Sequence, residues 1–159
     1  MNVKNKKFIK ILVMILFIFS GYSLLWCINS MFYEKPTQEY EKFDGYYVKT
    51  DENGFSYTLS RPGYLSFTGN YAITNSDDTL SILVWPHNLF NKNNIYGIQI
   101  YNDVNQHGYM FYVDKELQYT VNSLNKFSKD EITEINELLK LNAIELDKMN
   151  RIIEKEWKL

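Results

Sequence analysis

Two acidic segments of this chain have the residue types that bind cations or transfer protons. Asp51-Glu52-Asn53-Gly54 begins like a calcium loop, but Pro62 stands at the twelfth position, where such a loop needs a bidentate acid. Adjacent Asp77 and Asp78 could bind a metal or act as an acid–base pair, although neighbouring residues in a turn usually point apart. We therefore interpret both segments as solvated hairpin turns.

The two histidines and the single cysteine offer little more for catalysis. His87 and His107 lie beside expected loops, and Asp103 precedes His107 by a spacing that specifies no metal site. The chain has no G-x-S-x-G sequence, no phosphate-binding glycine loop and no H-E-x-x-H sequence. We therefore predict no catalytic residue, no metal and no cofactor. The alternative is a small extracytoplasmic hydrolase that uses Asp77, Asp78 or Asp103.

The chain begins with a basic tip followed by an apolar segment, and these precede the elements that must position any site. Four lysines lie within the first ten residues, and no acid comes before Glu34. Residues 8–28 read FIKILVMILFIFSGYSLLWCI, and a helix of that length is about 31 Å long, enough to cross a bilayer. Basic flanks stay in the cytoplasm. We therefore predict a cytoplasmic tip (1–7), a transmembrane helix (8–28), a stalk (29–42) and an extracytoplasmic domain (43–159).

Two other interpretations of the apolar segment stay open. A cleaved signal peptide would share the basic start, but the nearest small-x-small triplet, Gly21-Tyr22-Ser23, is followed by more apolar residues. A lipoprotein modified at Cys27 would need a small residue before the cysteine, where Trp26 stands. The uncleaved anchor is therefore favoured. Without its four leading lysines, the rest of the chain has 13 basic and 19 acidic residues, a net charge of −6.

The composition fits one folded domain after the anchor. The length is 159 residues, near the average for a single domain, and 16% of them are aromatic, which argues against disorder. A net charge of −2 argues against nucleic-acid binding, and one cysteine excludes an internal disulfide framework.

The body changes from strand to helix periodicity. Between residues 43 and 121, apolar and polar residues alternate in about seven short runs, including 65–73 and 117–121, separated by turns too short for parallel crossovers. Ser128 and Glu131 then form a capping box, and apolar residues repeat at three and four along a helix from about Lys129 to Trp157, with a break at Asn142 left open. This predicts an α+β fold, a mostly antiparallel sheet packed against a C-terminal amphipathic helix.

The alternation leaves the second face of this sheet rich in hydroxyl, amide and aromatic side chains. That mixture is typical of protein-binding surfaces, although an ordinary solvated sheet face also favours Thr and Tyr. Trp85 favours binding, and we select Trp85, Tyr101, Tyr112, Thr58 and Thr68 as candidate contacts. The full predicted face is Tyr47, Ser56, Thr58, Ser60, Ser66, Thr68, Asn70, Ser81, Trp85, Gln99, Tyr101, Tyr112, Gln118 and Thr120.

Several short segments carry a resemblance that covers most of the body. They are Phe67-Thr68-Gly69-Asn70, Ile82-Leu83-Val84-Trp85-Pro86, Tyr96-Gly97-Ile98, Tyr109-Met110-Phe111-Tyr112-Val113-Asp114 and the helix ending in Trp157. Together with the basic tip and single membrane segment, they resemble the TipC family of immunity proteins from Gram-positive bacteria. The resemblance implies a non-enzymatic antidote outside the membrane. Its partner would be an LXG-type toxin exported by type VII secretion, whose attack on cell-wall precursor it blocks. A subunit of a membrane complex remains a further alternative.

Overall fold

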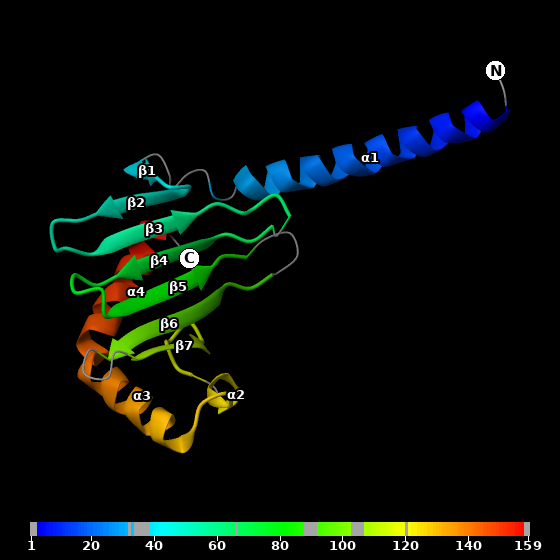
Figure 1. Cartoon of the computed structure of the whole chain (residues 1–159). Coiled ribbons are helices and arrows are strands. Elements are labelled where there is room, and N and C mark those ends of the chain that lie inside the picture. The colour runs from blue at the N-terminus through cyan, green and yellow to red at the C-terminus, as the bar shows by residue number, and fades with distance from the viewer. Residues whose placement is uncertain are drawn as a thin grey trace.

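The computed structural model describes residues 3–31, 33, 39–65, 67–87, 92–102, 107–119 and 121–157, with side chains from residue 7 onward except that of residue 121. Its first element, α1 (Val3–Met31), projects away from a body made of one sheet and C-terminal helices (Figure 1). Within α1, the stretch Lys7–Met31 is long and apolar enough to span a membrane by length and composition. It contains the whole of the predicted segment 8–28.

The body is built on one seven-stranded antiparallel sheet whose spatial order is the chain order. Each strand pairs with the next because short connections allow only antiparallel neighbours. The α+β prediction is therefore confirmed. The strands are β1 (Glu41–Phe43), β2 (Tyr46–Thr50), β3 (Ser56–Ser60), β4 (Asn70–Thr74), β5 (Leu80–Trp85), β6 (Ile95–Asn102) and β7 (His107–Val113).

The strands predicted at two places are different in the structure. Residues 117–121 form no ladder: Leu117 takes a left-handed φ of 60°, and only Tyr119 bridges Val113 before α2 (Val121–Leu124) begins. The start of the predicted strand over 65–73 is a loop, because Phe67 takes a φ of 54° and β4 begins at Asn70. The seventh strand is instead β1, which lies largely within the predicted stalk.

The apolar residues predicted to repeat along one C-terminal helix are divided between two helices, α3 (Lys129–Leu141) and α4 (Ala143–Trp157). The predicted capping box is present, since the Ser128 amide donates to Glu131 Oε2 (2.7 Å) and the Glu131 amide donates to Ser128 Oγ (3.3 Å). The break at Asn142, left open by the sequence, occurs because this residue caps α3: its side-chain amide donates to the Leu138 carbonyl (2.8 Å). The helix then restarts in a second segment.

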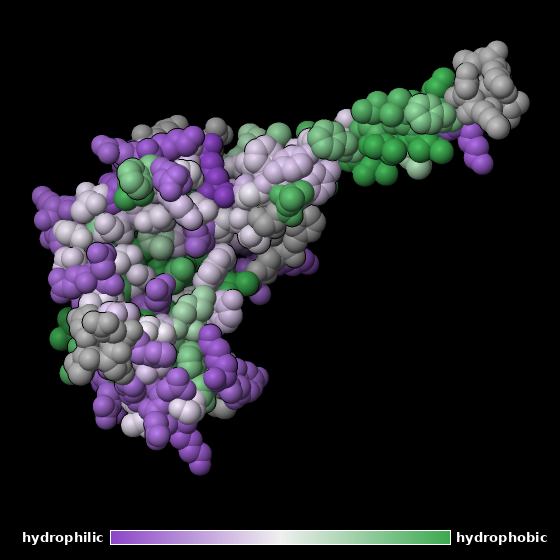
Figure 2. All heavy atoms as spheres, in the orientation of Figure 1, coloured by the Kyte–Doolittle hydropathy of each residue, from purple (hydrophilic) through white to green (hydrophobic). Residues whose placement is uncertain are grey.

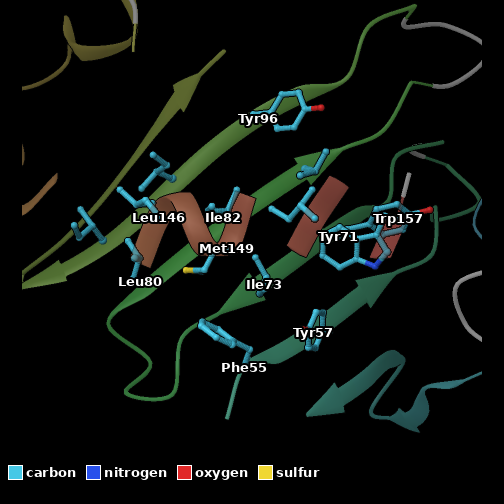
Figure 3. Close-up of a cluster of buried hydrophobic side chains, with 14 of the residues drawn as sticks. Phe55, Tyr57, Tyr71, Ile73, Leu80, Ile82, Tyr96, Leu146, Met149 and Trp157 are labelled. Carbon is cyan, nitrogen blue, oxygen red and sulfur yellow. The ribbon is translucent and has the colours of Figure 1, made fainter. Parts of the chain in front are cut away.

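The core lies between the sheet and α4 (Figure 3). Leu146, Met149, Ile153 and Trp157 of α4 are buried at the spacing of one helical face. The Trp157 ring lies 5.0 Å from that of Tyr71, and its indole N–H donates to the buried Tyr40 hydroxyl (3.0 Å). Packing therefore covers one face of the sheet with α4.

We expect Ile153→Ala to lower the free energy of unfolding by ~2–5 kcal/mol, because Ile153 is 1% exposed and its loss leaves a cavity. Ile144→Ala is the matched control on the same helix, since Ile144 is 89% exposed, and should change stability by about 0.5 kcal/mol or less. Denaturant titration of the detergent-solubilised chain, followed by circular dichroism, measures both. Equal losses would contradict the described packing.

Candidate functional site

The sheet has a second face that no helix of the described chain covers. Successive side chains of a strand point to opposite faces, so the strand register decides which residues share one. Val48 pairs with Thr58, Thr58 with Ala72, Ala72 with Leu83, Leu83 with Gly97 and Gly97 with Tyr112. These six residues form one row across β2–β7 on the face opposite to the core, which we call the open face.

The open face carries no charged side chain on β2–β7 within the part of the chain that the structure describes. Because α4 runs behind the sheet in Figure 1, this face is turned to the viewer, and Figure 2 shows pale and green atoms over its middle with purple atoms around them. Its residues are Tyr46, Val48, Thr50, Ser56, Thr58, Ser60, Asn70, Ala72, Thr74, Ser81, Leu83, Trp85, Ile95, Gly97, Gln99, Tyr101, Gly108, Met110 and Tyr112.

An aromatic pair stands at the β5–β7 side of the open face. The Trp85 ring lies across Gly97, where an added Cβ would come within 3.1 Å of it. The same ring meets Tyr112 edge-on, with 5.8 Å between ring centroids. A side chain at position 97 would therefore require the indole to move by a few tenths of an ångström from its place on the sheet. Tyr112 remains 54% exposed, so the pair presents aromatic surface to solvent.

The structure places four of the five predicted contact residues on the open face. Trp85 and Tyr112 are in contact, Tyr101 lies further along β6 and is 38% exposed, and Thr58 lies in the row of Tyr112, four strands away. At ~4.8 Å per strand, Thr58 and Tyr112 are about 19 Å apart. The four residues thus span a surface broad enough for a folded partner.

The fifth predicted contact, Thr68, was wrongly placed on the sheet. It is exposed in the loop before β4, because Phe67 adopts the left-handed conformation and turns the chain out of the strand. Tyr47 was also wrongly assigned to the open face: it pairs with Leu59 and packs against the core, with the Arg61 guanidinium 4.6 Å from its ring centroid. Gln118 lies in the turn after β7, and Ser66 and Thr120 fall outside the described residues.

Sequence reasoning missed the other apolar members of the open face. Ile95 is 41% exposed beside Trp85, while Leu83 and Met110 are half-buried. The alternation of side chains along β5–β7 was a usable signal for them, since Leu83 and Met110 each lie two residues from a predicted face residue and Ile95 lies four residues from Gln99. Together, Ile95, Leu83 and Met110 make the surface around Trp85 and Tyr112 more apolar than the residues predicted for this face would be alone.

The Asp51 carboxylate is engaged within its own hairpin. Oδ1 accepts from the backbone amides of Asn53 (2.9 Å) and Phe55 (3.0 Å), and Oδ2 accepts from the Tyr57 hydroxyl (2.9 Å). Burial opposes ionisation here, but the accepted hydrogen bonds outweigh it and lower the pKa of Asp51. This arrangement explains Asp51 as a turn residue.

The remaining acidic and histidine candidates are spread over the surface. Asp77 and Asp78 are exposed in the β4–β5 turn, His87 follows β5, and His107 Nε2 lies 3.9 Å from Glu131. Asp103 lies outside the described residues. Over the described ranges, no group of three or more His, Cys, Asp or Glu residues is arranged to hold a metal ion.

Comparison with protein-family models, curated proteins and solved structures finds no match to this chain. The functional argument therefore rests on the geometry of the open face and on the apolar helix.

Trp85 and Trp157 provide a test of the face assignment, because one lies on the open face and the other in the core. Trp157→Ala should lower the free energy of unfolding by ~3–5 kcal/mol, since it is 8% exposed. Trp85→Ala should cost clearly less, because its ring is half-exposed over Gly97. Denaturant titration of both variants measures this, and equal losses would show that Trp85 belongs to a core.

Proposed function

We propose that this chain is a membrane-anchored extracytoplasmic immunity protein that binds a cognate secreted antibacterial toxin and blocks it sterically. The observation that carries the proposal is the open face, which combines a broad surface free of charged side chains on β2–β7 of the described chain with a Trp–Tyr pair at its β5–β7 side. The centres of protein interfaces are depleted in charge and enriched in Trp, Tyr and Met.

The aromatic pair suits a binding role because both rings are held before any partner arrives. Trp85 is fixed over Gly97 and against Tyr112, so little side-chain entropy is lost when it is buried. Such pre-ordered aromatic groups commonly supply most of the affinity of an interface. The Ser and Thr hydroxyls around them can exchange hydrogen bonds with water for hydrogen bonds with a partner.

The apolar helix supports the location that this function requires. By length and composition α1 can span a membrane, and in the proposed topology its lysines stay in the cytoplasm while the body faces outward. Tethering confines the body to the surface where a cell-wall toxin acts, which raises its effective concentration there. The resemblance to the TipC family, which rests on short sequence segments alone, implies the same role. No catalytic step enters the proposal.

The binding prediction concerns three aromatic residues of the open face. Trp85→Ala, Tyr101→Ala and Tyr112→Ala should each weaken binding to the toxin by ~2 kcal/mol or more, about thirtyfold, because truncation removes an anchor. The probe is a purified LXG-type toxin, titrated by calorimetry against the detergent-solubilised chain. Wild-type protein should bind it at one-to-one stoichiometry.

Ile144→Ala is the control for these variants, because Ile144 is exposed on α4, away from the open face. It should bind as the wild type does, and circular dichroism should show that every variant is folded. If the three aromatic variants bind normally while Asp77→Ala does not, the toxin binds at the hairpin ends and the proposal for the open face is wrong.

The topology prediction is independent of the toxin. Protease added to intact protoplasts should digest the body, because the basic tip keeps the amino terminus inside. An epitope placed before residue 3 should survive until the membrane is permeabilised. A body that resists protease until permeabilisation would contradict both the topology and the immunity function.

A further inference from the structure

The last turns of α1 are joined to the body through the loop between β3 and β4, residues 61–69, which we call the 61–69 loop. Figure 1 shows this loop against the C-terminal turns of α1. The Tyr64 ring lies 5.1 Å from that of Tyr22 and 5.4 Å from that of Trp26. It also meets Phe19 at 6.3 Å between centroids. The aromatic residues of α1 therefore pack on a loop of the body.

Side chains of α1 also satisfy backbone carbonyls of the 61–69 loop. The Tyr22 hydroxyl donates to the Tyr64 carbonyl (2.6 Å), and the Trp26 indole N–H donates to the Pro62 carbonyl (3.2 Å). The Asn29 amide, fully buried, donates to the Phe67 carbonyl (2.9 Å). Irregular backbone at a membrane requires such partners, because lipid offers no hydrogen bonds.

The contacts extend along α1 into the predicted membrane-spanning stretch. Trp side chains favour the membrane interface. With Trp26 at the outer interface, Phe19 lies seven residues deeper, about 10 Å along the helix axis. Because Tyr64 contacts both residues, the 61–69 loop reaches the level of the membrane boundary. Figure 2 shows the green surface of α1 giving way to pale residues where it meets the body.

Next to Tyr64, the loop exposes a large apolar side chain. Leu65 is 87% exposed, although Phe67 two residues later is buried. Gly69 holds the loop close to the body, because an added Cβ there would meet the Tyr33 ring at 2.8 Å. The exposed leucine is therefore carried on a loop fixed to α1 and the sheet.

The acidic turns at 51–54 and 75–78 lie away from the 61–69 loop. The turns at 51–54 and 75–78 lie together at the opposite ends of β3 and β4 from the 61–69 loop, since a Cβ on Gly54 would lie 3.0 Å from Ser76 Cβ. They hold Asp51, Glu52, Asp77 and Asp78. The 61–69 loop has no acid and one arginine. The loop itself can therefore approach a lipid surface without repulsion from those acids, while Asp44 and Asp114 at the same end of the sheet belong to other turns, after β1 and β7.

We propose that the 61–69 loop is a second membrane contact, in which Leu65 enters the boundary between headgroups and acyl chains beside α1. Tyr64 lies at the same level and links the loop to the helix. The body is thereby held at the membrane surface through two contacts, with the 51–54 and 75–78 turns pointing away. Two contacts restrain rotation of the open face, which one flexible tether would not do.

The test places an environment-sensitive fluorophore on the loop. The full chain, in a Cys27→Ser background, carries NBD on Leu65→Cys and is reconstituted in vesicles of phosphatidylcholine and phosphatidylglycerol. We expect the NBD emission to be stronger and shifted to shorter wavelength than that of the same labelled protein unfolded in water. A nitroxide attached to the lipid should quench the emission, and iodide in the aqueous phase should not. Leu65 is exposed, so its substitution removes no core contact.

The matched control carries the same probe on Ile144→Cys, which is equally exposed but lies on α4. That probe should emit as in water and be quenched by iodide. A Leu65 probe as accessible to iodide as the Ile144 probe would overturn the proposal. Equal protection of both probes would also overturn it, because the body would then lie on the membrane by another surface.

Discussion

The packing of α4 across one face of the sheet is the contact on which the rest of the structure depends. A seven-stranded sheet has two faces, and the described C-terminal helices bury only one of them. Met149, Ile153 and Trp157 supply the apolar surface of that contact, while α1 projects away from the body. The opposite face is thus left open. Any function proposed for this chain has to account for a surface of that size without charged side chains on β2–β7.

The parts of the fold that follow from local patterns could be predicted from the sequence. Ser128 and Glu131 define the start of α3 through hydrogen bonds between residues three apart, and the alternation in β3 and β5–β7 fixes which side chains share a face. For the same reason, Trp85, Tyr101, Tyr112 and Thr58 could be placed on the open face. Each of these inferences needs only neighbours along the chain.

The wrong predictions arose where distant residues decide the backbone. Thr68 belonged to an alternating run, but Asn29 binds the Phe67 carbonyl from 38 residues away and the chain leaves the strand there. Tyr47 could not be placed because β2 has a large aromatic residue on each face of the sheet, Tyr46 and Tyr47. Only the pairing of Tyr47 with Leu59 shows which of the two faces the core. The junction between α1 and the 61–69 loop escaped prediction because no local pattern reports a contact between an apolar helix and a distant loop.

The most direct measurement is hydroxyl-radical footprinting of the full chain with and without an LXG-type toxin, the partner class that we propose. Trp85, Met110 and Tyr112 are oxidisable side chains on the open face, and Leu141 and Ile144 are exposed apolar residues on the helices. Our account predicts that the toxin slows oxidation of the first three and leaves the last two unchanged. Protection of Leu141 and Ile144, with Trp85 and Tyr112 oxidised as in the free chain, would contradict it.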